Sequence, residues 1–303
     1  MTWINTPVGS GGGGGGGGND TNSAFNARLT LESGVPVSVS DQSAKSTLYL
    51  TPFRGNQISI YTGSAWANSA LAEISIALSG LTSGLPYDVF VFLSTGVLTL
   101  ELVAWTDGVT RATALAVQDG VYVKTAALTH RYVGTIRTTG TTTTADTLLQ
   151  RFVWNYYNRV GRSFQNFTAD DRWDYTSATW RYANGASSNR VECVVGVNED
   201  PVLLSLLTSV QLALNTDTAR VGIGLDVNSD PPTSFYAGAK ELGLTSPTAA
   251  RQPLSSTFNA LVGIGYHYLA WLEYGAVGAS SVCTFSGDEG GGASSGLSGH
   301  ILA

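Results

Sequence analysis

Charged side chains are scarce in this chain. Asp, Glu, Lys and Arg make up 13% of its 303 residues, about half of the usual share in a soluble domain. Acidic residues number 22 and basic residues 16, which gives a formal net charge of −6. Nucleic-acid binding needs Lys and Arg concentrated on one face, and the nearest approach is Arg151, Arg159 and Arg162, spread over an aromatic segment. We therefore predict no nucleic-acid partner.

Gly, Thr, Ser and Asn take the place of the missing charges. A surface covered in Thr and Ser repels other copies of itself less than one covered in Lys and Glu, so this composition favours self-assembly. A neutral β-protein with polar loops is the alternative reading.

Cysteine is almost absent, which excludes a disulfide framework. The two cysteines, Cys193 and Cys283, lie in apolar runs typical of strands. We expect two buried thiols, and a single disulfide between them is the alternative.

Long apolar runs are missing too. The nearest approach to a membrane span, residues 261–271, contains His267 and glycines. Residues 1–5 lack the basic and apolar regions of a signal peptide. We expect a chain that is made and folds in a cytoplasm, without membrane insertion.

The usual equipment of an enzyme is also lacking. None of the three histidines, His130, His267 and His300, has a second His or Cys at metal-ligand spacing. His267 lies between two tyrosines in an apolar run, and we interpret it as a hydrogen-bonded structural residue. We predict no metal and no cofactor.

Paired carboxylates can serve glycoside cleavage, and three acidic pairs occur: Asp170–Asp171, Glu199–Asp200 and Asp288–Glu289. Neighbours on a strand point to opposite faces, so adjacent acids make a poor catalytic couple. Residues 292–296 match G-x-S-x-G without the strand and helix that a nucleophile elbow needs. Gly222 and Gly224 lack the third glycine of a dinucleotide site. We predict that the protein is not an enzyme and has no catalytic residues.

The N-terminal segment stands apart from the rest of the chain. Eight consecutive glycines at 11–18 form a flexible string. They follow a short apolar peg that contains Trp3, Ile4, Pro7 and Val8. We interpret residues 1–22 as a Gly-rich anchoring arm that attaches the protein to a larger assembly. A disordered N-terminus is the alternative.

Residues 23–140 alternate apolar and polar side chains over short runs separated by turn residues. The runs include 28–31, 47–50, 57–61, 87–92, 97–105, 120–123 and 131–136. Short strands at this spacing indicate an antiparallel sandwich or barrel. This segment is our predicted N-terminal β-domain.

Residues 141–172 are expected to connect two domains. Within them Leu148, Phe152 and Tyr156 fall at i, i+4 and i+8, which predicts an amphipathic helix over 147–158. The aromatic content also permits a strand. Dense aromatic side chains favour burial, either against another subunit or domain or as a cap on the protein's own sheet.

The strand pattern resumes over 173–303, which we predict to form a jelly-roll-like domain. The fold class is thus mostly β, with two antiparallel β-sandwich or jelly-roll-like domains, a short aromatic helical connector and the Gly-rich arm.

Four stretches resemble a widespread group of tailed-phage and prophage structural proteins. They are residues 28–37, 49–56, 87–91 and 152–159, and they recur in the order typical of that group. The resemblance implies a tail, fibre or head-decoration component, assembled in the host cytoplasm and located in the virion. It carries no catalytic residues.

Three C-terminal stretches, 221–225, 265–273 and 296–301, resemble the strands of trimeric jelly rolls of the C1q and TNF type. That resemblance implies three copies packed about one axis. It is an analogy of fold and does not define a function.

We therefore expect a trimeric fibre or spike, attached to other virion proteins through its N-terminal arm and able to contact a host-surface glycan. A capsid decoration or head fibre is one alternative, and a polysaccharide-degrading spike is another. Exposed aromatic residues can stack on sugar rings. The candidates are Tyr61, Trp66, Trp173, Tyr175 and Tyr236, each of which fits a core or interface position equally well.

Overall fold

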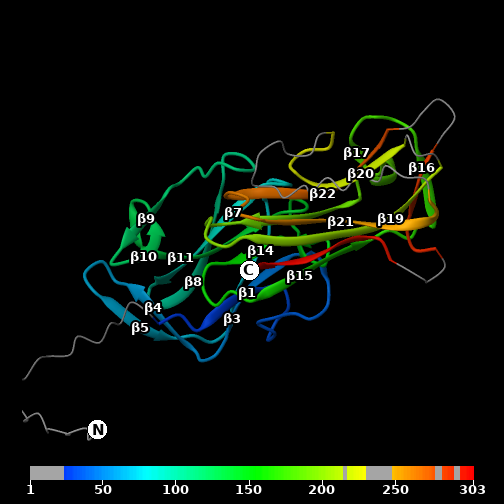
Figure 1. Cartoon of the computed structure of the whole chain (residues 1–303). Helices are drawn as coiled ribbons and strands as arrows, with labels where there is room; N and C mark the ends of the chain where they lie inside the picture. Colours follow the sequence, from blue (N-terminus) through cyan, green and yellow to red (C-terminus); the bar gives the residue numbers. More distant parts are fainter. Residues whose placement is uncertain (1–23, 214–216, 230–247, 277–281, 290–293) are drawn as a thin grey trace, which may run out of the picture.

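A computed structural model describes residues 24–213, 217–229, 248–276, 282–289 and 294–303 (Figure 1). The anchoring arm expected over residues 1–22, with Trp3, Ile4, Pro7 and Val8, lies outside the described residues. So does Tyr236.

Strands dominate the structure. Those of the first part are β1 (Ala27–Thr30), β2 (Gln42–Lys45), β3 (Thr47–Pro52), β4 (Gln57–Tyr61), β5 (Trp66–Ala70), β6 (Ile74–Ala77), β7 (Pro86–Ser94), β8 (Val97–Ala104), β9 (Leu115–Gln118), β10 (Val121–Lys124) and β11 (Ala127–Arg137). Those of the second part are β12 (Thr144–Asp146), β13 (Gln150–Arg151), β14 (Val153–Asn155), β15 (Gly161–Phe167), β16 (Arg172–Tyr175), β17 (Arg181–Tyr182), β18 (Arg190–Val195), β19 (Val202–Leu212), β20 (Thr218–Leu225), β21 (Thr248–Ala260), β22 (Gly265–Ala276), β23 (Cys283–Ser286) and β24 (Gly296–Leu302). Among the described residues the helical structure is limited to one 3-10 turn, η1 (Ala183–Gly185). The mostly-β prediction is confirmed.

One layer of the first sandwich is a sheet with strand order β8-β7-β11-β10-β9, in which β14 also pairs with β11. We call it the β11 sheet. The sheet β1-β3-β6 and the hairpin β4-β5 cover one of its faces. Between them lies a core of aliphatic residues, among which are Leu29, Leu50, Ile58, Val89 and Val133, all at most 2% exposed.

The second sandwich has two larger sheets. The β22 sheet has the order β17-β22-β18-β13-β12-β2 with β20 paired to β22, and the β19 sheet has the order β15-β24-β19-β23-β16 with β21 paired to β19. The strand pairs in both sheets are antiparallel, except for the parallel pair β13 and β18. Their facing sides bury Cys193, Leu206, Trp271, Phe285 and Leu297 in a second core.

The β11 sheet contributes to both cores, because successive side chains of a strand point to opposite faces. On β11, Val133 enters the first core and its neighbour Tyr132 enters the second. Val153 and Trp154 of β14 divide in the same way. The two sandwiches are therefore joined by shared buried surface, and Figure 1 shows them end to end in one elongated body, with β4, β5 and β9 near one end and β16 near the other.

The helix expected over residues 147–158 is wrong, because this segment forms β13 and β14. A helix would place Leu148, Phe152 and Tyr156 on one face. The fold instead needs Val153 and Trp154 on opposite sides, which only a period of two provides. A local turn precedes β13, where the Thr147 hydroxyl accepts hydrogen bonds from the backbone N–H groups of Leu149 (3.3 Å) and Gln150 (3.0 Å).

Both cysteines are buried free thiols, as expected, and burial raises the pKa of each. No helix within the described residues has the length and apolar character needed to cross a membrane.

Candidate functional site

Two surface features stand out. The first is a cavity of about 560 Å³ at the junction of the sandwiches. Its wall is formed by the loop between β1 and β2, by the turn before β13 and by the start of β15. The lining residues are Val37, Ser38, Val39, Ser40, Asp41, Leu148, Arg151, Gly161, Arg162 and Ser163.

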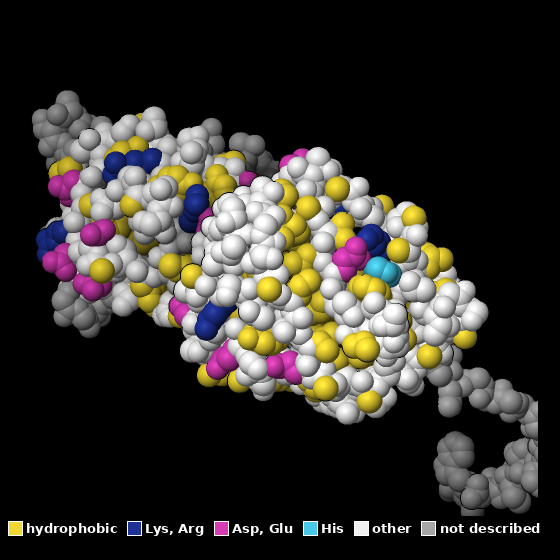
Figure 2. Space-filling model, turned by 180° about the vertical axis from the view of Figure 1, so that it is seen from behind, with side chains coloured by type: hydrophobic (Ala, Val, Ile, Leu, Met, Phe, Trp, Pro, Cys, Tyr) yellow, Lys and Arg dark blue, Asp and Glu magenta, His cyan; other side chains and the backbone are white. Residues whose placement is uncertain are grey.

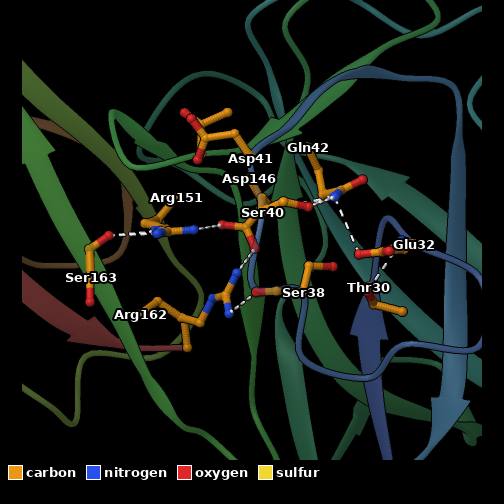
Figure 3. A network of polar contacts seen from close by, with 12 residues as sticks. Thr30, Glu32, Ser38, Ser40, Asp41, Gln42, Asp146, Arg151, Arg162 and Ser163 are labelled. Atoms are coloured by element: carbon orange, nitrogen blue, oxygen red, sulfur yellow. Dashed lines mark hydrogen bonds and ion pairs between the residues drawn. The ribbon is translucent and has the colours of Figure 1, made fainter.

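Two arginines of this wall hold one carboxylate between them (Figure 3). Arg151 Nη1 lies 2.9 Å from Asp146 Oδ1, and Arg162 Nη2 lies 2.9 Å from Asp146 Oδ2. Each guanidinium also donates to a backbone carbonyl, Arg151 to Ser163 (2.6 and 2.9 Å) and Arg162 to Ser38 (2.8 Å). These bonds fix the orientation of both side chains, which are at most 10% exposed.

A third arginine lies behind them. Arg28 lines a smaller cavity together with Asp146 and Arg162. It donates to backbone oxygens of Pro36 (3.1 Å), Asn158 and Ala303 (2.8 Å). Burial, and then the positive charge of Arg162, lower the pKa of Arg28 to about 10.

The loop between β1 and β2 is held in place over the cavity. Asp41 Oδ1 accepts the backbone N–H of Leu148 at 2.9 Å. Gln42 Nε2 donates to Ser40 (3.1 Å to Oγ) and to Glu32 Oε2 (3.3 Å). Figure 3 shows the contacts of Gln42 beside the arginine pair. The cavity wall is therefore preformed rather than loosely arranged.

The second feature is the outer face of the β19 sheet. In one part of this face, strand register aligns outward residues in three rows across β15, β24, β19 and β21. Beyond these rows, the exposed Arg172 and Asp174 of β16 lie on the same side of the sheet. The rows are Ser163–His300–Leu203–Asn259, Gln165–Ser298–Ser205–Thr257 and Phe167–Gly296–Leu207–Ser255. None of these twelve residues is Asp, Glu, Lys or Arg. We call this area the neutral face.

The neutral face has a raised end and a hollow end. Leu207 is 53% exposed and Phe167 is 43% exposed in the last row. Around the first row lies a hollow of about 360 Å³, lined by Leu203, Phe258, Asn259 and Gly299 among others. On the face that Figure 2 draws, a view of the molecule from behind, charged side chains are few and lie among neutral ones.

The aromatic candidates for sugar stacking separate into two groups. Trp173 and Tyr175 are buried in the second core, at 8% and 9% exposure, so for these two the core alternative holds. Tyr61 and Trp66 remain half-buried on the β4–β5 hairpin, with ring centroids 5.5 Å apart. Trp66 Nε1 donates to Asp119 Oδ2 at 3.0 Å.

The histidine and acidic candidates lie apart from one another. His267 is buried, and its Nδ1 lies 2.8 Å from Asp226 Oδ2, which confirms the expected structural role. Glu199 pairs with Arg159 at 2.8 Å. Within the described residues no group of three or more His, Cys, Asp and Glu side chains is arranged to hold a metal ion.

The cavity arginines were not predicted as a site from the sequence. Arg151 and Arg162 were noted there only as sparse basic residues. A usable indication was the strand phase of β15, where Arg162 shares the buried side with Phe164. An arginine in an apolar phase needs buried partners, and Asp146 supplies one.

Comparisons with known proteins do not extend this description. No protein-family model and no curated protein matches the chain. Two delta-endotoxins of Bacillus thuringiensis align at 7% identity: Cry8Ea1, with a TM-score of 0.21 over 92% of this chain and 52% of that one, and a Cry1Da tryptic core variant, with 0.20 over 86% and 48%. The structure of the infectious bursal disease virus Gx strain aligns at 12% identity and a TM-score of 0.22, over 89% and 78%. The chain spans about half the length of the two endotoxins, and such low TM-scores establish neither a shared fold nor a function.

Proposed function

We propose that the protein is a structural component of a tailed-bacteriophage particle that assembles with copies of itself through the neutral face. The N-terminal residues, with Trp3, Ile4, Pro7 and Val8, would attach it to other virion proteins. The resemblance to phage structural proteins supports a location in the virion. The neutral face is the observation that supports self-assembly.

The physical argument concerns desolvation. Burying an ionised side chain costs several kcal/mol unless it is well paired, and the three rows contain no Asp, Glu, Lys or Arg. Their Ser, Thr, Asn and Gln side chains can exchange water for partner hydrogen bonds, and Leu203, Leu207 and Phe167 add apolar area. When two neutral faces meet, the desolvation cost is therefore low.

The size of the face sets the expected strength. Four strands about 4.8 Å apart and rows about 6.8 Å apart cover about 400 Å², half of the ~800 Å² per partner of a standard interface. Contact through these rows alone should therefore be weak. Anchoring several copies side by side on a particle would raise their effective concentration to about millimolar and complete the assembly.

The predicted number of copies is three. If three copies direct the neutral face toward a common axis, each face meets two neighbours, and the raised end at Leu207 can enter the hollow beside Leu203 of another copy. In this arrangement the outer face is interior to the assembly.

Light scattering on the eluate of a size-exclusion column, over a range of protein concentrations, tests the assembly role. We expect the wild-type mass to rise toward three chains with concentration. Leu207→Asp should hold it at one chain, because the new carboxylate is buried without a partner. The matched control is Val117→Asp on β9, where an aliphatic residue is 61% exposed outside the neutral face, and it should associate like the wild type.

A single-chain mass at every concentration would contradict assembly through this face. Virion placement is tested separately, by purifying particles on a density gradient and identifying their chains by mass spectrometry, with gold-labelled antibody distinguishing tail from head. Absence of the chain from such particles would contradict the placement. Release of reducing sugar from host polysaccharide would favour the spike-enzyme alternative.

A further inference from the structure

The cavity at the junction of the sandwiches has the dimensions of a ligand site. Its volume of about 560 Å³ lies within the range of roughly 300–1,000 Å³ that is usual for small-molecule pockets. The lining is mixed. Val37, Val39 and Leu148 provide apolar surface, and Ser38 and Ser40 provide hydroxyl groups.

The guanidinium groups of the wall outnumber the carboxylates of its interior. Arg151 and Arg162 both pair with one carboxylate, that of Asp146. The other carboxylate of the lining, that of Asp41, is exposed at the rim, where water screens its charge. The interior beside the two guanidinium groups is therefore positive.

The remaining hydrogen bonds of these two guanidinium groups go to the carbonyl oxygens of Ser163 and Ser38, which leave their charge in place. Behind them, burial and then the Arg162 charge lower the pKa of Arg28. An anion in the cavity would supply negative charge to the arginine pair.

One polar group of the wall has no hydrogen-bond partner within the protein. Ser38 is 5% exposed, and its Oγ is buried without a partner, although its carbonyl holds Arg162. A buried hydroxyl without a hydrogen-bond partner lowers the stability of the fold by about 1–3 kcal/mol.

We propose that this cavity binds a single oxyanion group, either on an acidic sugar or as free sulfate or phosphate. The guanidinium groups of Arg151 and Arg162, fixed by their carbonyl contacts, supply donors of the kind that bind carboxylate and sulfate. The serine hydroxyls and the aliphatic side chains suit the hydroxyl groups and the ring face of a sugar. Such binding is independent of the self-association proposed above and of its location on a particle.

Titration calorimetry on the full-length protein tests the proposal at low ionic strength. The probes are trigalacturonate, inorganic sulfate, inorganic phosphate and the neutral sugar maltotriose. We expect binding of at least one anion with a Kd of about a millimolar, weakened by added salt, and none of maltotriose. A stronger response to trigalacturonate than to sulfate or phosphate identifies an acidic glycan as the source, and the reverse identifies a free anion.

The decisive variant should gain affinity, because a gain cannot come from misfolding. Asp41→Asn keeps an oxygen for the Leu148 N–H and removes the rim carboxylate, so anion binding should tighten about threefold. The matched control is Asp107→Asn, an exposed aspartate that likewise accepts a backbone N–H, from Val109 at 2.8 Å, and its affinity should equal that of the wild type. Equal affinities for the wild type and Asp41→Asn, equal binding of maltotriose, or no anion binding would overturn the proposal.

Discussion

Two regions of this protein differ sharply in charge. At the junction of the sandwiches, Arg28, Asp88 and Arg162 are all less than 10% exposed. Twelve outward residues of the neutral face, by contrast, include no Asp, Glu, Lys or Arg. Charged side chains are thus buried with partners at the junction and absent from these three rows of the surface.

This contrast separates two meanings of a low charge content. Inside, each charge is held by specific partners, so its removal should be costly. Outside, the exposed side chains of the neutral face contribute little to the stability of the single chain. Adding a charge there should therefore affect association far more than the free energy of unfolding.

The largest loss of stability is expected at the junction of the two sandwiches. Arg111 lies 2.6 Å from Asp88, and its guanidinium also donates to the carbonyl of Gly196 in the second sandwich. Arg111→Ala would leave Asp88, which is 2% exposed, as a buried carboxylate without its cation. We expect the free energy of unfolding to fall by about 3–5 kcal/mol, measured by urea denaturation with tryptophan fluorescence.

A surface ion pair provides the control for this loss. Arg172 lies 3.1 Å from Glu289, where the two side chains are 58% and 13% exposed, and Glu289 also pairs with Arg251. Arg172→Ala should cost less than about 1 kcal/mol. Equal losses in the two variants would remove the distinction between the charged junction and the rest of the protein.

Much of the fold was accessible from the sequence, because alternation of side chains is a local property. The mostly-β class followed from runs such as residues 87–92. The β13–β14 segment was misjudged for the same reason. Its i, i+4 spacing is compatible with a helix, and only the position of a core on each side of Val153 and Trp154 selects a strand.

The candidate sites depend on contacts that are distant in sequence. Arg28 donates to Ala303, and Arg162 donates to the loop at Ser38. Strand register alone aligns Phe167, Leu207 and Ser255 in one row. Local patterns contain neither the pairing nor the register, so neither site could be derived from them.

A second large effect concerns pH. Glu273 is fully buried, and its carboxylate accepts hydrogen bonds from Trp173 Nε1 (2.6 Å) and Arg181 Nε (2.8 Å). Burial outweighs these contacts and raises its pKa from 4.5 to about 7. Between those pH values the unfolded chain is ionised while the folded protein keeps its proton, so raising the pH favours unfolding.

The stability that Glu273 contributes should accordingly be present below pH 4.5 and fall by about 3 kcal/mol as the pH rises to 7. Glu273→Gln removes the titrating group and should flatten this part of the profile. Denaturation midpoints of the wild type and of Glu273→Gln, measured at intervals from pH 5 to 7.5, test this prediction. The same slope in both proteins would show that another group is responsible.

The smallest effect on folding is expected at the neutral face. Ser205 is exposed in the middle row of that face, between Ser298 and Thr257. In Ser205→Lys the long side chain can extend into water from an isolated chain, so the free energy of unfolding measured at low concentration should change by less than about 0.5 kcal/mol.

Association should respond differently, because two neutral faces that meet would now bring like charges together and bury them without partners. For the wild type, the thermal midpoint should rise with protein concentration, since association stabilises the folded state by mass action. For Ser205→Lys it should stay constant over the same range. If both midpoints rise alike, copies meet elsewhere on the molecule. If the variant unfolds readily even when dilute, the face is needed for the fold of the single chain, and its neutrality requires a different explanation.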